Sequence, residues 1–359
     1  MNDTPAEASP AQPAPPPSRA RRVLGMLNST PVKAAVAIAI LYWMWHTQML
    51  DFDALKPASW TLVGLACAIV LPSFLIATLR FKLLLNGLGL ECTYWRALVW
   101  TMIGEFWNVA MPGTGGDLMK AVYVVQTYGP GRRGVAAMCV LLDRIMGLWG
   151  LLCFGLCACL AGGAAVSGNE QLVHVRNVLL AICLTSLLAL LLLASPWIQK
   201  SRLRQKLMNL LPFPEKFEKI YQGFSNLMQR PGTIFAALGL SVLNHAVWCA
   251  GILALAYGLG QNFDPWAGMV VIPIALFANV FGFAGGFGVG EFAFDKLFQL
   301  LLNQPQGTGA ALAFAFHLIA LAMRLFVAGP FYILAGRGQP GGEIAAQGPA
   351  QSAETVNPE

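Results

Sequence analysis

Charged residues are scarce in this sequence. Only 11% of its 359 residues are charged, 57% are hydrophobic, and the mean hydropathy is +0.61. A soluble domain carries about 25% charged and roughly 45–50% apolar residues. So few charges cannot cover one buried core with a solvated shell. The composition argues against a soluble enzyme, a nucleic-acid-binding protein and a secreted disulfide scaffold, and it indicates a polytopic membrane protein.

Residues that bind metals or perform nucleophilic catalysis are sparse as well. The four histidines are scattered and form no HExxH motif, and the cysteines between 153 and 159 have no histidine in their apolar stretch. Ser167 and Ser195 have no base at a readable spacing. We interpret His245 as a hydrogen-bonded core residue, with a proton relay as the alternative. We therefore predict no metal, no cofactor and no catalytic residue.

Long apolar runs are present instead. A membrane-spanning helix needs about 20 apolar residues. The first run has no small-residue cleavage site and is followed by Asp51 and Asp53, so we expect a retained helix rather than a signal peptide. Full-length spans are predicted at 34–50, 59–79, 134–163, 177–197, 233–259 and 309–336. The membrane domain is predicted at 31–337, between disordered tails at 1–30 and 338–359 that are rich in Pro, Ala or Gly.

Two further apolar stretches are interrupted. The stretch at 94–127 is broken by a Pro-Gly segment at 111–117, and the stretch at 266–302 is broken by clustered glycines at 282–291. Each half is too short to span a bilayer comfortably. Pro and Gly stop a helix, and unpaired backbone groups cannot face lipid, so such breaks occur where they line a cavity in the protein. Both stretches are predicted to form re-entrant helix hairpins.

The basic residues predict the orientation. With six full crossings and two hairpins, sixteen basic residues fall on one side and only Lys56 and Arg176 on the other. The positive-inside rule then places both termini on the cytoplasmic side of the membrane, and it makes the two hairpins enter from opposite faces. The predicted fold is all-α and resembles an inverted repeat, an arrangement that transporters use around a central site. The sixteen are Arg19, Arg21, Arg22, Lys33, Arg80, Lys82, Arg132, Arg133, Lys200, Arg202, Arg204, Lys206, Lys216, Lys219, Arg230 and Arg337.

Several charged residues are predicted at membrane depth, where each costs at least about 2.5–3.5 kcal/mol. Most lie near the two breaks, three or four residues from another polar residue and therefore on one helix face. Asn108, for example, shares a face with Glu105. The nine charges are Glu105, Asp117, Lys120, Asp143, Arg144, Glu291, Asp295, Lys296 and Arg324.

These charges have two interpretations. In the first, they only pair with one another: Asp117 and Glu291 cap their half-helices, and Asp143 and Arg144 hold the bundle together. In the second, which we favour, they line a polar cavity at the midplane. The half-helices that begin near Asp117 and Glu291 point their N-termini at this cavity, and N-termini attract anions. The basic side chains would bind a phosphate, and the acidic ones would act as counter-charges or carry a coupling proton.

If both breaks contribute to one site, loss of Asp117 and loss of Glu291 should each impair transport. The effects of the two losses should not be additive in the double variant, because residues of one network couple. Arg80, just after the second span, has two open interpretations. It is either a positive-inside anchor at the cytoplasmic boundary or a residue that captures a headgroup at the mouth of the cavity.

Taken together, these residues resemble the membrane domain of lysylphosphatidylglycerol synthases and their stand-alone flippase-like relatives. The shared pattern is an Arg after the second helix, Asn-x-x-x-Pro-Gly-x-x-Gly-acidic-x-x-basic, acidic-Arg, and Gly-Gly-x-Gly-x-x-Glu, over about residues 30–337. The matching residues are Arg80, Asn108, Pro112, Gly113, Gly116, Asp117, Lys120, Asp143, Arg144, Gly285, Gly286, Gly288, Glu291 and Arg324. Asp117 and Asp143 stand where the family often has Glu, and Lys120 where it often has Arg.

The resemblance implies that the chain moves a lipid-linked headgroup, anionic or phosphate-bearing, between membrane leaflets. Glu105 and Asp295 join the matching residues as candidate substrate-binding groups. The two-domain relatives carry a soluble aminoacyl-transferase domain, which the segment from Gly338 to Glu359 is too short to hold, so we expect no synthase activity and no enzyme. Lipid-synthesis enzymes are possible partners.

Two other classes of function stay open. One is a membrane-embedded lipid-modifying enzyme with Glu105, Asp117 or Glu291 as its base. The other is an accessory scaffold for lipid or isoprenoid synthesis that uses the basic loop at 198–230. The scaffold hypothesis predicts that alanine at the charged residues near the breaks is harmless, whereas deletion of that loop is not.

Overall fold

The computed structural model describes residues 42, 46, 56, 58–110, 115–128, 130–194, 227–279 and 288–338. Several predicted features lie wholly or mostly outside them: the span at 34–50, residues 111–114 of the first break and 282–287 of the second, the loop at 198–230, and the tails at 1–30 and, beyond Gly338, at 338–359. The described helices are α3 (Trp60–Val70), α4 (Pro72–Gly87), α5 (Tyr94–Ala110), α6 (Gly115–Thr127), η2 (Pro130–Arg132), α7 (Arg133–Ala161), α8 (Gly163–Ser167), α9 (Glu170–Ala194), α13 (Pro231–Gly258), α14 (Pro265–Asn279), α15 (Val289–Leu302), α16 (Thr308–Met323), the π-helical turn η4 (Arg324–Ala328) and α17 (Gly329–Gly338).

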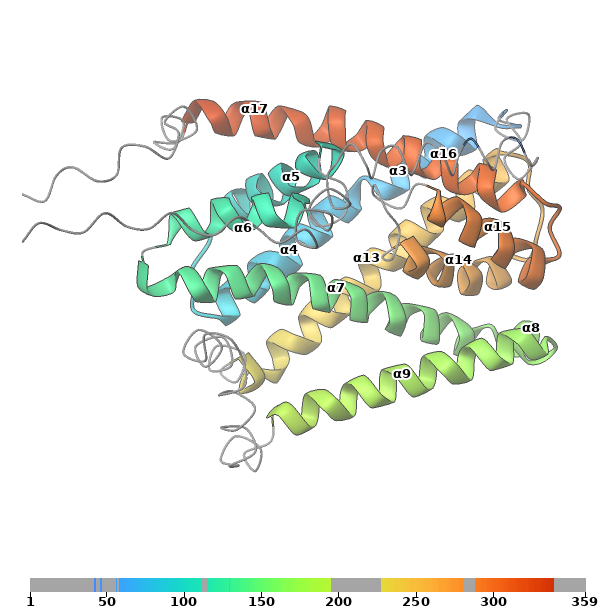
Figure 1. The fold of residues 1–359 in the computed structure, drawn as a ribbon, viewed down its shortest axis with the longest axis horizontal. Helices are drawn as coiled ribbons and strands as arrows, with labels where there is room; N and C mark the ends of the chain where they lie inside the picture. Colours follow the sequence, from blue (N-terminus) through green and yellow to red (C-terminus); the bar gives the residue numbers. More distant parts are fainter. Residues whose placement is uncertain are drawn as a thin grey trace, which may run out of the picture.

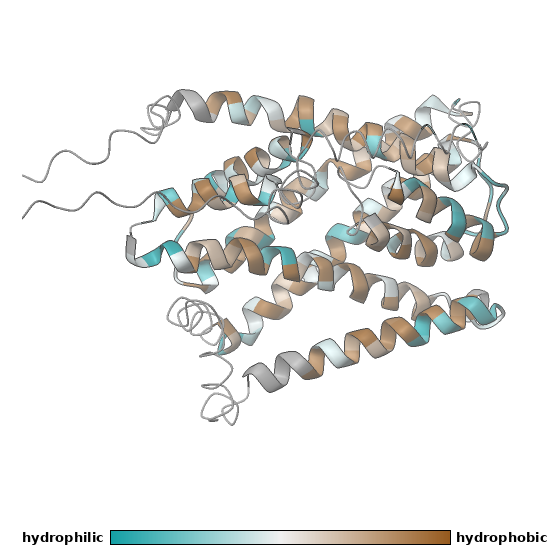
Figure 2. Ribbon diagram, in the orientation of Figure 1, coloured by the Kyte–Doolittle hydropathy of each residue, from teal (hydrophilic) through white to brown (hydrophobic). Residues whose placement is uncertain are grey.

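The described chain is an all-α, multi-pass membrane protein. Five helical segments are long and apolar enough to cross a membrane: Trp60–Gly87, Arg133–Ala161, Glu170–Leu188, Pro231–Gly258 and Thr308–Leu334. They correspond to five of the six predicted spans. Hydrophobic residues cover most of the length of α9, and hydrophilic residues lie at its first turns (Figure 2). This is the pattern that a bilayer solvent requires.

Helix α13 is the centre of the bundle. It packs against α3, α4 and α7 and also contacts α14 and α16 (Figure 1). One buried apolar cluster joins α7 and α13 to α14, α15 and α16, and a second joins α4 and α6 to α7. Helices α7 and α13 therefore connect the two ends of the molecule.

The two interrupted stretches form two pairs of packed helices. Helix α5 packs against α6, and α14 packs against α15. The first pair lies at the end of the bundle where α7 begins, and the second pair lies at the opposite end (Figure 1). That each pair enters and leaves the membrane through one face stays a prediction.

The last span contains an irregular turn. The residues Arg324–Ala328 form a π-helical turn between α16 and α17, and such turns are frequent at functional sites. This turn and α17 pack against α5. The ring of Phe106 stacks on Tyr332 with centroids 4.9 Å apart, and Trp95 lies 5.7 Å from Phe331. The C-terminal span is thereby attached to the first helix pair.

Candidate functional site

A cavity of about 260 Å³ lies among α4, α5, α6, α7 and α13. Helix α5 contributes Thr101, Glu105 and Asn108, which recur at helical spacing on one face. Most of the charges predicted near the first break converge here. The polar and charged residues that line the cavity are Arg80, Thr101, Glu105, Asn108, Asp117, Lys120, Asp143, Arg144, Asn244 and His245.

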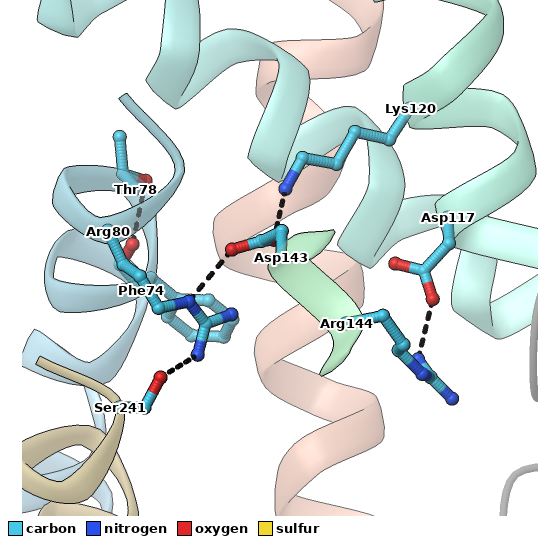
Figure 3. Close-up of polar contacts among 8 residues, drawn as sticks. All are labelled: Phe74, Thr78, Arg80, Asp117, Lys120, Asp143, Arg144 and Ser241. Atoms are coloured by element: carbon cyan, nitrogen blue, oxygen red, sulfur yellow. Dashed lines mark hydrogen bonds and ion pairs between the residues drawn. The ribbon is translucent and has the colours of Figure 1, made fainter. Parts of the chain in front are cut away.

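One carboxylate of α7 joins two cations from other helices (Figure 3). Arg80 Nε donates to Asp143 Oδ1 at 2.8 Å, and Lys120 Nζ donates to Asp143 Oδ2 at 2.9 Å. All three residues are buried. Since two cations surround one carboxylate, this triad carries one net positive charge inside the bundle.

Both cations of the triad are held in place. Arg80 Nη1 donates to Ser241 Oγ at 2.9 Å, and its guanidinium lies over Gly147, where a Cβ atom would be 3.3 Å from Nη1. Lys120 Nζ lies 3.4 Å from the ring centroid of Phe81, in cation–π geometry. The positive charge is therefore positioned before any ligand binds, and both cations carry more N–H groups than these bonds use.

Two further ion pairs are more exposed than the triad. Arg144 Nη1 donates to Asp117 Oδ2 at 2.6 Å, with the side chains 48% and 32% exposed. Arg324, in the π-helical turn, donates from Nε to Glu105 Oε2 at 3.1 Å, with the side chains about equally half-buried. Each of these carboxylates has its own arginine. The surplus positive charge thus belongs to the triad.

The two helices of the first pair cross closely at Gly116. Its backbone N–H donates to Asn108 Oδ1 at 3.1 Å. A Cβ atom at Gly116 would overlap the carbonyl oxygen of Gly104 and the side chain of Asn108. Asn108 and Gly116, two residues of the sequence motif, therefore fix the crossing of α5 and α6, and so place Glu105 and Asp117 beside the cavity.

Two polar atoms of the cavity wall have no hydrogen-bond partner among the described residues. They are Thr101 Oγ1 on α5 and Asn244 Oδ1 on α13, and both side chains are more than nine-tenths buried. Buried polar atoms are nearly always hydrogen-bonded, and leaving one unpaired costs roughly 1–3 kcal/mol. Thr101 Oγ1 can donate or accept, and Asn244 Oδ1 can only accept, so together with the triad these atoms suit a bound ligand that has an anionic group and a hydroxyl or N–H donor.

The charges near the second break lie in a separate cluster. Glu291 is fully buried; its Oε1 is 2.8 Å from His317 Nδ1, and its Oε2 accepts from the backbone N–H of Gly288. Asp295 accepts from the backbone N–H of Gly307 at 2.7 Å and from Gln299 Nε2. None of these side chains lines the cavity beside the triad. The expectation of one charged site shared by both breaks is therefore corrected, and the capping role of Glu291 is present.

Arg80 also needs a correction. The predicted span ended at residue 79, but α4 continues to Gly87, so Arg80 lies inside the helix with 8% of its surface exposed. It is therefore not an exposed anchor after the end of the span, whereas its part in binding a headgroup stays a prediction, since Arg80 lines the cavity. Its charge is met by Asp143 in the interior. Pro112 and Gly286, the other predicted site residues, lie outside the described part of the chain.

Sequence reasoning missed four residues: three at the cavity or its triad, and His317 in the separate cluster of Glu291. Ser241 and Asn244 recur on one face of the apolar helix α13, next to His245, whose Nε2 is 2.9 Å from the carbonyl oxygen of Gly147. A polar face in a membrane span is a signal that could have identified them. The predicted hydrogen bond of His245 is present, but the residue is only partly buried and lines the cavity. Thr101 and His317 had no signal of this kind.

The comparisons with known proteins agree with this architecture. The family described as "Lysylphosphatidylglycerol synthase TM region" matches residues 32–328. The match covers most of the chain, which therefore belongs to this family. A search among curated proteins finds no match.

Proposed function

We propose that this protein moves a phosphate-bearing lipid headgroup between the two leaflets of a bacterial inner membrane and binds it in the cavity. The observation that carries the proposal is the single surplus positive charge of the Arg80–Asp143–Lys120 triad beside that cavity. A phosphodiester carries one negative charge, so its binding would neutralise the site. The Thr101 hydroxyl can donate to one of its oxygens, whereas Asn244 Oδ1 can accept a hydrogen bond only from a hydroxyl or N–H group elsewhere on the headgroup.

The position of the site supports a lipid as the bearer of the anion. The cavity lies between spanning helices, and its more exposed pair, Arg144–Asp117, offers a headgroup its first charged contacts. The triad lies deeper and is desolvated, so its charge acts in a medium of lower dielectric. In this proposal the chain is a carrier and performs no chemical step on the lipid.

The proposed orientation places the basic end of the bundle in the cytoplasm. Helices α7 and α13 begin, and α17 ends, at the same end of the molecule (Figure 1). Arg132, Arg133 and Arg230 lie at these helix starts, whereas α9, with Arg176, begins at the opposite end. Cysteine-accessibility labelling tests this orientation: a cysteine at position 132 should be protected from impermeant reagents in intact cells, and external labelling would contradict the topology.

The transport proposal is tested in liposomes that contain the purified protein. Tail-labelled lipids with a phosphodiester headgroup are compared with a neutral diacylglycerol for exchange between leaflets. Lys120→Met removes the surplus charge and should slow exchange of the anionic lipid by about tenfold to a hundredfold, because a charge-assisted hydrogen bond contributes about 1.5–3 kcal/mol. Glu91→Gln, at an exposed position, is the control. Equal rates for Lys120→Met and wild type, or no exchange by wild type, would refute the proposal.

A further inference from the structure

An apolar groove of about 240 Å³ lies beside the charged cavity, between α7, α9 and α14. Its wall is formed by Leu151 and Gly155 of α7, Val175 and Leu179 of α9, and Pro273 of α14. Helix α9 packs on α7 and has few contacts with α14, so the groove opens sideways between α9 and α14. A groove of this composition can accept hydrocarbon but not a charged headgroup.

The groove and the cavity are neighbours along α7. Leu151 lines both of them. Arg144, Leu148, Leu151 and Gly155 follow one another at helical spacing, so one face of α7 leads from the charged pair to the groove. At 1.5 Å per residue this face measures about 16 Å, close to half of the ~30 Å hydrocarbon core, which is the depth that the chains of one leaflet occupy.

We infer that the groove binds one hydrocarbon chain of the same lipid whose headgroup occupies the cavity. This inference rests on the proposed function and extends it, because it makes the protein a receptor for the chain as well as for the headgroup. The occupant is one acyl or prenyl chain, since the groove has a volume of only about 240 Å³, and a second chain stays in the bilayer. The chain enters through the opening between α9 and α14.

The order of the two sites agrees with a lipid taken from the basic end of the bundle. The charged cavity is nearer the start of α7, and the groove is nearer its end. A lipid of the leaflet at the basic end has the same order, with its headgroup toward that end and its chain toward the midplane. The bond from Trp149 Nε1 to Ser186 Oγ, 2.9 Å long, joins α7 and α9 on the cavity side of the groove.

Gly155 provides a variant that fills the groove. A Cβ atom there would lie 3.5 Å from Leu179 Cδ1 and 3.7 Å from Pro273 Cβ, which are ordinary contacts. A leucine can therefore be accommodated at the backbone, but its side chain occupies the space of the lipid chain. Gly239 on α13 is the matched control, because it is also inside a spanning helix and a Cβ atom there would have nothing within 4 Å.

The experiment uses the full chain in liposomes with a trace of phosphatidylglycerol that carries a diazirine midway along one acyl chain. After irradiation, labelled peptides are mapped by mass spectrometry, with unlabelled phosphatidylglycerol or diacylglycerol as competitors. We expect saturable labelling between Leu151 and Gly155 and between Val175 and Leu179, competed by phosphatidylglycerol and not by diacylglycerol. Gly155→Leu should abolish this labelling and slow leaflet exchange about tenfold, because the methylene groups of the lipid chain can no longer be buried in the groove. Gly239→Leu should have neither effect.

The outcomes separate this inference from the proposed function. Labelling of the groove that does not saturate, as at the exposed Leu184, would identify ordinary bilayer lipid and overturn the inference. Equal labelling in Gly155→Leu and Gly239→Leu would overturn it as well. Saturable labelling of the groove together with no leaflet exchange by wild type would support the chain site and refute transport. Leaflet exchange that Lys120→Met slows but Gly155→Leu does not would support transport and overturn the chain site.

Discussion

Arg80 Nε on α4 lies 2.8 Å from Asp143 Oδ1 on α7, although the two residues are 63 positions apart in the chain. The second oxygen of the same carboxylate bonds Lys120 on α6. Asp143 thus holds together three helices and also fixes the two cations that we assign to headgroup binding. Folding and proposed transport therefore depend on the same side chain. The more exposed pairs, Arg144–Asp117 and Arg324–Glu105, should contribute less to folding.

Asp143→Asn should destabilise the protein strongly. The substitution leaves Arg80 and Lys120 buried beside each other without a counter-charge, and removal of one partner from a buried ion pair costs about 3–5 kcal/mol. The free energy of unfolding in detergent measures the effect. Glu91→Gln, also an acid-to-amide change but at an exposed position, should stay within about 0.5 kcal/mol of wild type. Similar unfolding curves for the two variants would show that the triad does not hold the bundle.

Arg144→Gln should separate stability from transport. Arg144 is 48% exposed, and an ion pair of that exposure contributes about 0–1 kcal/mol to stability. We expect normal yield of folded protein but leaflet exchange reduced by about tenfold or more, since a charge-assisted contact to the headgroup is lost. The two measurements are size-exclusion profile and exchange rate on the same preparation. A loss of folded protein as large as that of Asp143→Asn would contradict the assignment.

Asp117 should be coupled to Arg144 and independent of Glu291. Asp117 and Arg144 are in direct contact, whereas Glu291 bonds His317 and Gly288 in a separate cluster. Residues in contact show coupling, and distant residues without shared partners are additive. In leaflet exchange, Asp117→Asn combined with Arg144→Gln should be no slower than the slower single variant. For Asp117→Asn combined with Glu291→Gln, the fold-reduction in exchange rate should equal the product of the two single fold-reductions. A smaller reduction in the double variant would support the sequence-based expectation of one network.

Gly116→Ala should disturb the crossing of α5 and α6. The added methyl group overlaps the Gly104 carbonyl oxygen and the Asn108 side chain, and such overpacking typically costs about 1–3 kcal/mol. Gly64→Ala is the matched control on α3, where a Cβ atom meets nothing within 4 Å and alanine has the higher helix propensity. Thermal unfolding of both variants measures the difference. A stabilised Gly116→Ala protein would mean that the two helices do not approach closely in the membrane.

The spans could be predicted because a bilayer imposes one local requirement, a run of about 20 apolar residues, that each segment meets by itself. The end of the second span could not. A charge at residue 80 argues for a boundary unless its partner is known, and that partner, Asp143, is in another helix. The span therefore continues to Gly87 through a residue that local hydropathy places outside.

The candidate site was partly visible for the same reason. The motif residues around the first break, from Asn108 to Lys120, are close in sequence, so their convergence could be predicted. The separation of Glu291 from that site could not, since it depends on His317, which is 26 residues away and carries no pattern of its own. The contributions of Thr101 and Ser241 follow from helix packing, which sequence spacing does not contain.

The π-helical turn at Arg324–Ala328 sets the rotational phase of the C-terminal span. A turn with one extra residue shifts every later side chain by about 100° around the helix axis relative to a continuous α-helix. Phe331 and Tyr332 meet Trp95 and Phe106 of α5 only in the shifted phase. A one-residue deletion within the turn would therefore turn Phe331 and Tyr332 away from α5. The number of residues in this turn, more than their identity, determines how α17 packs on the first helix pair.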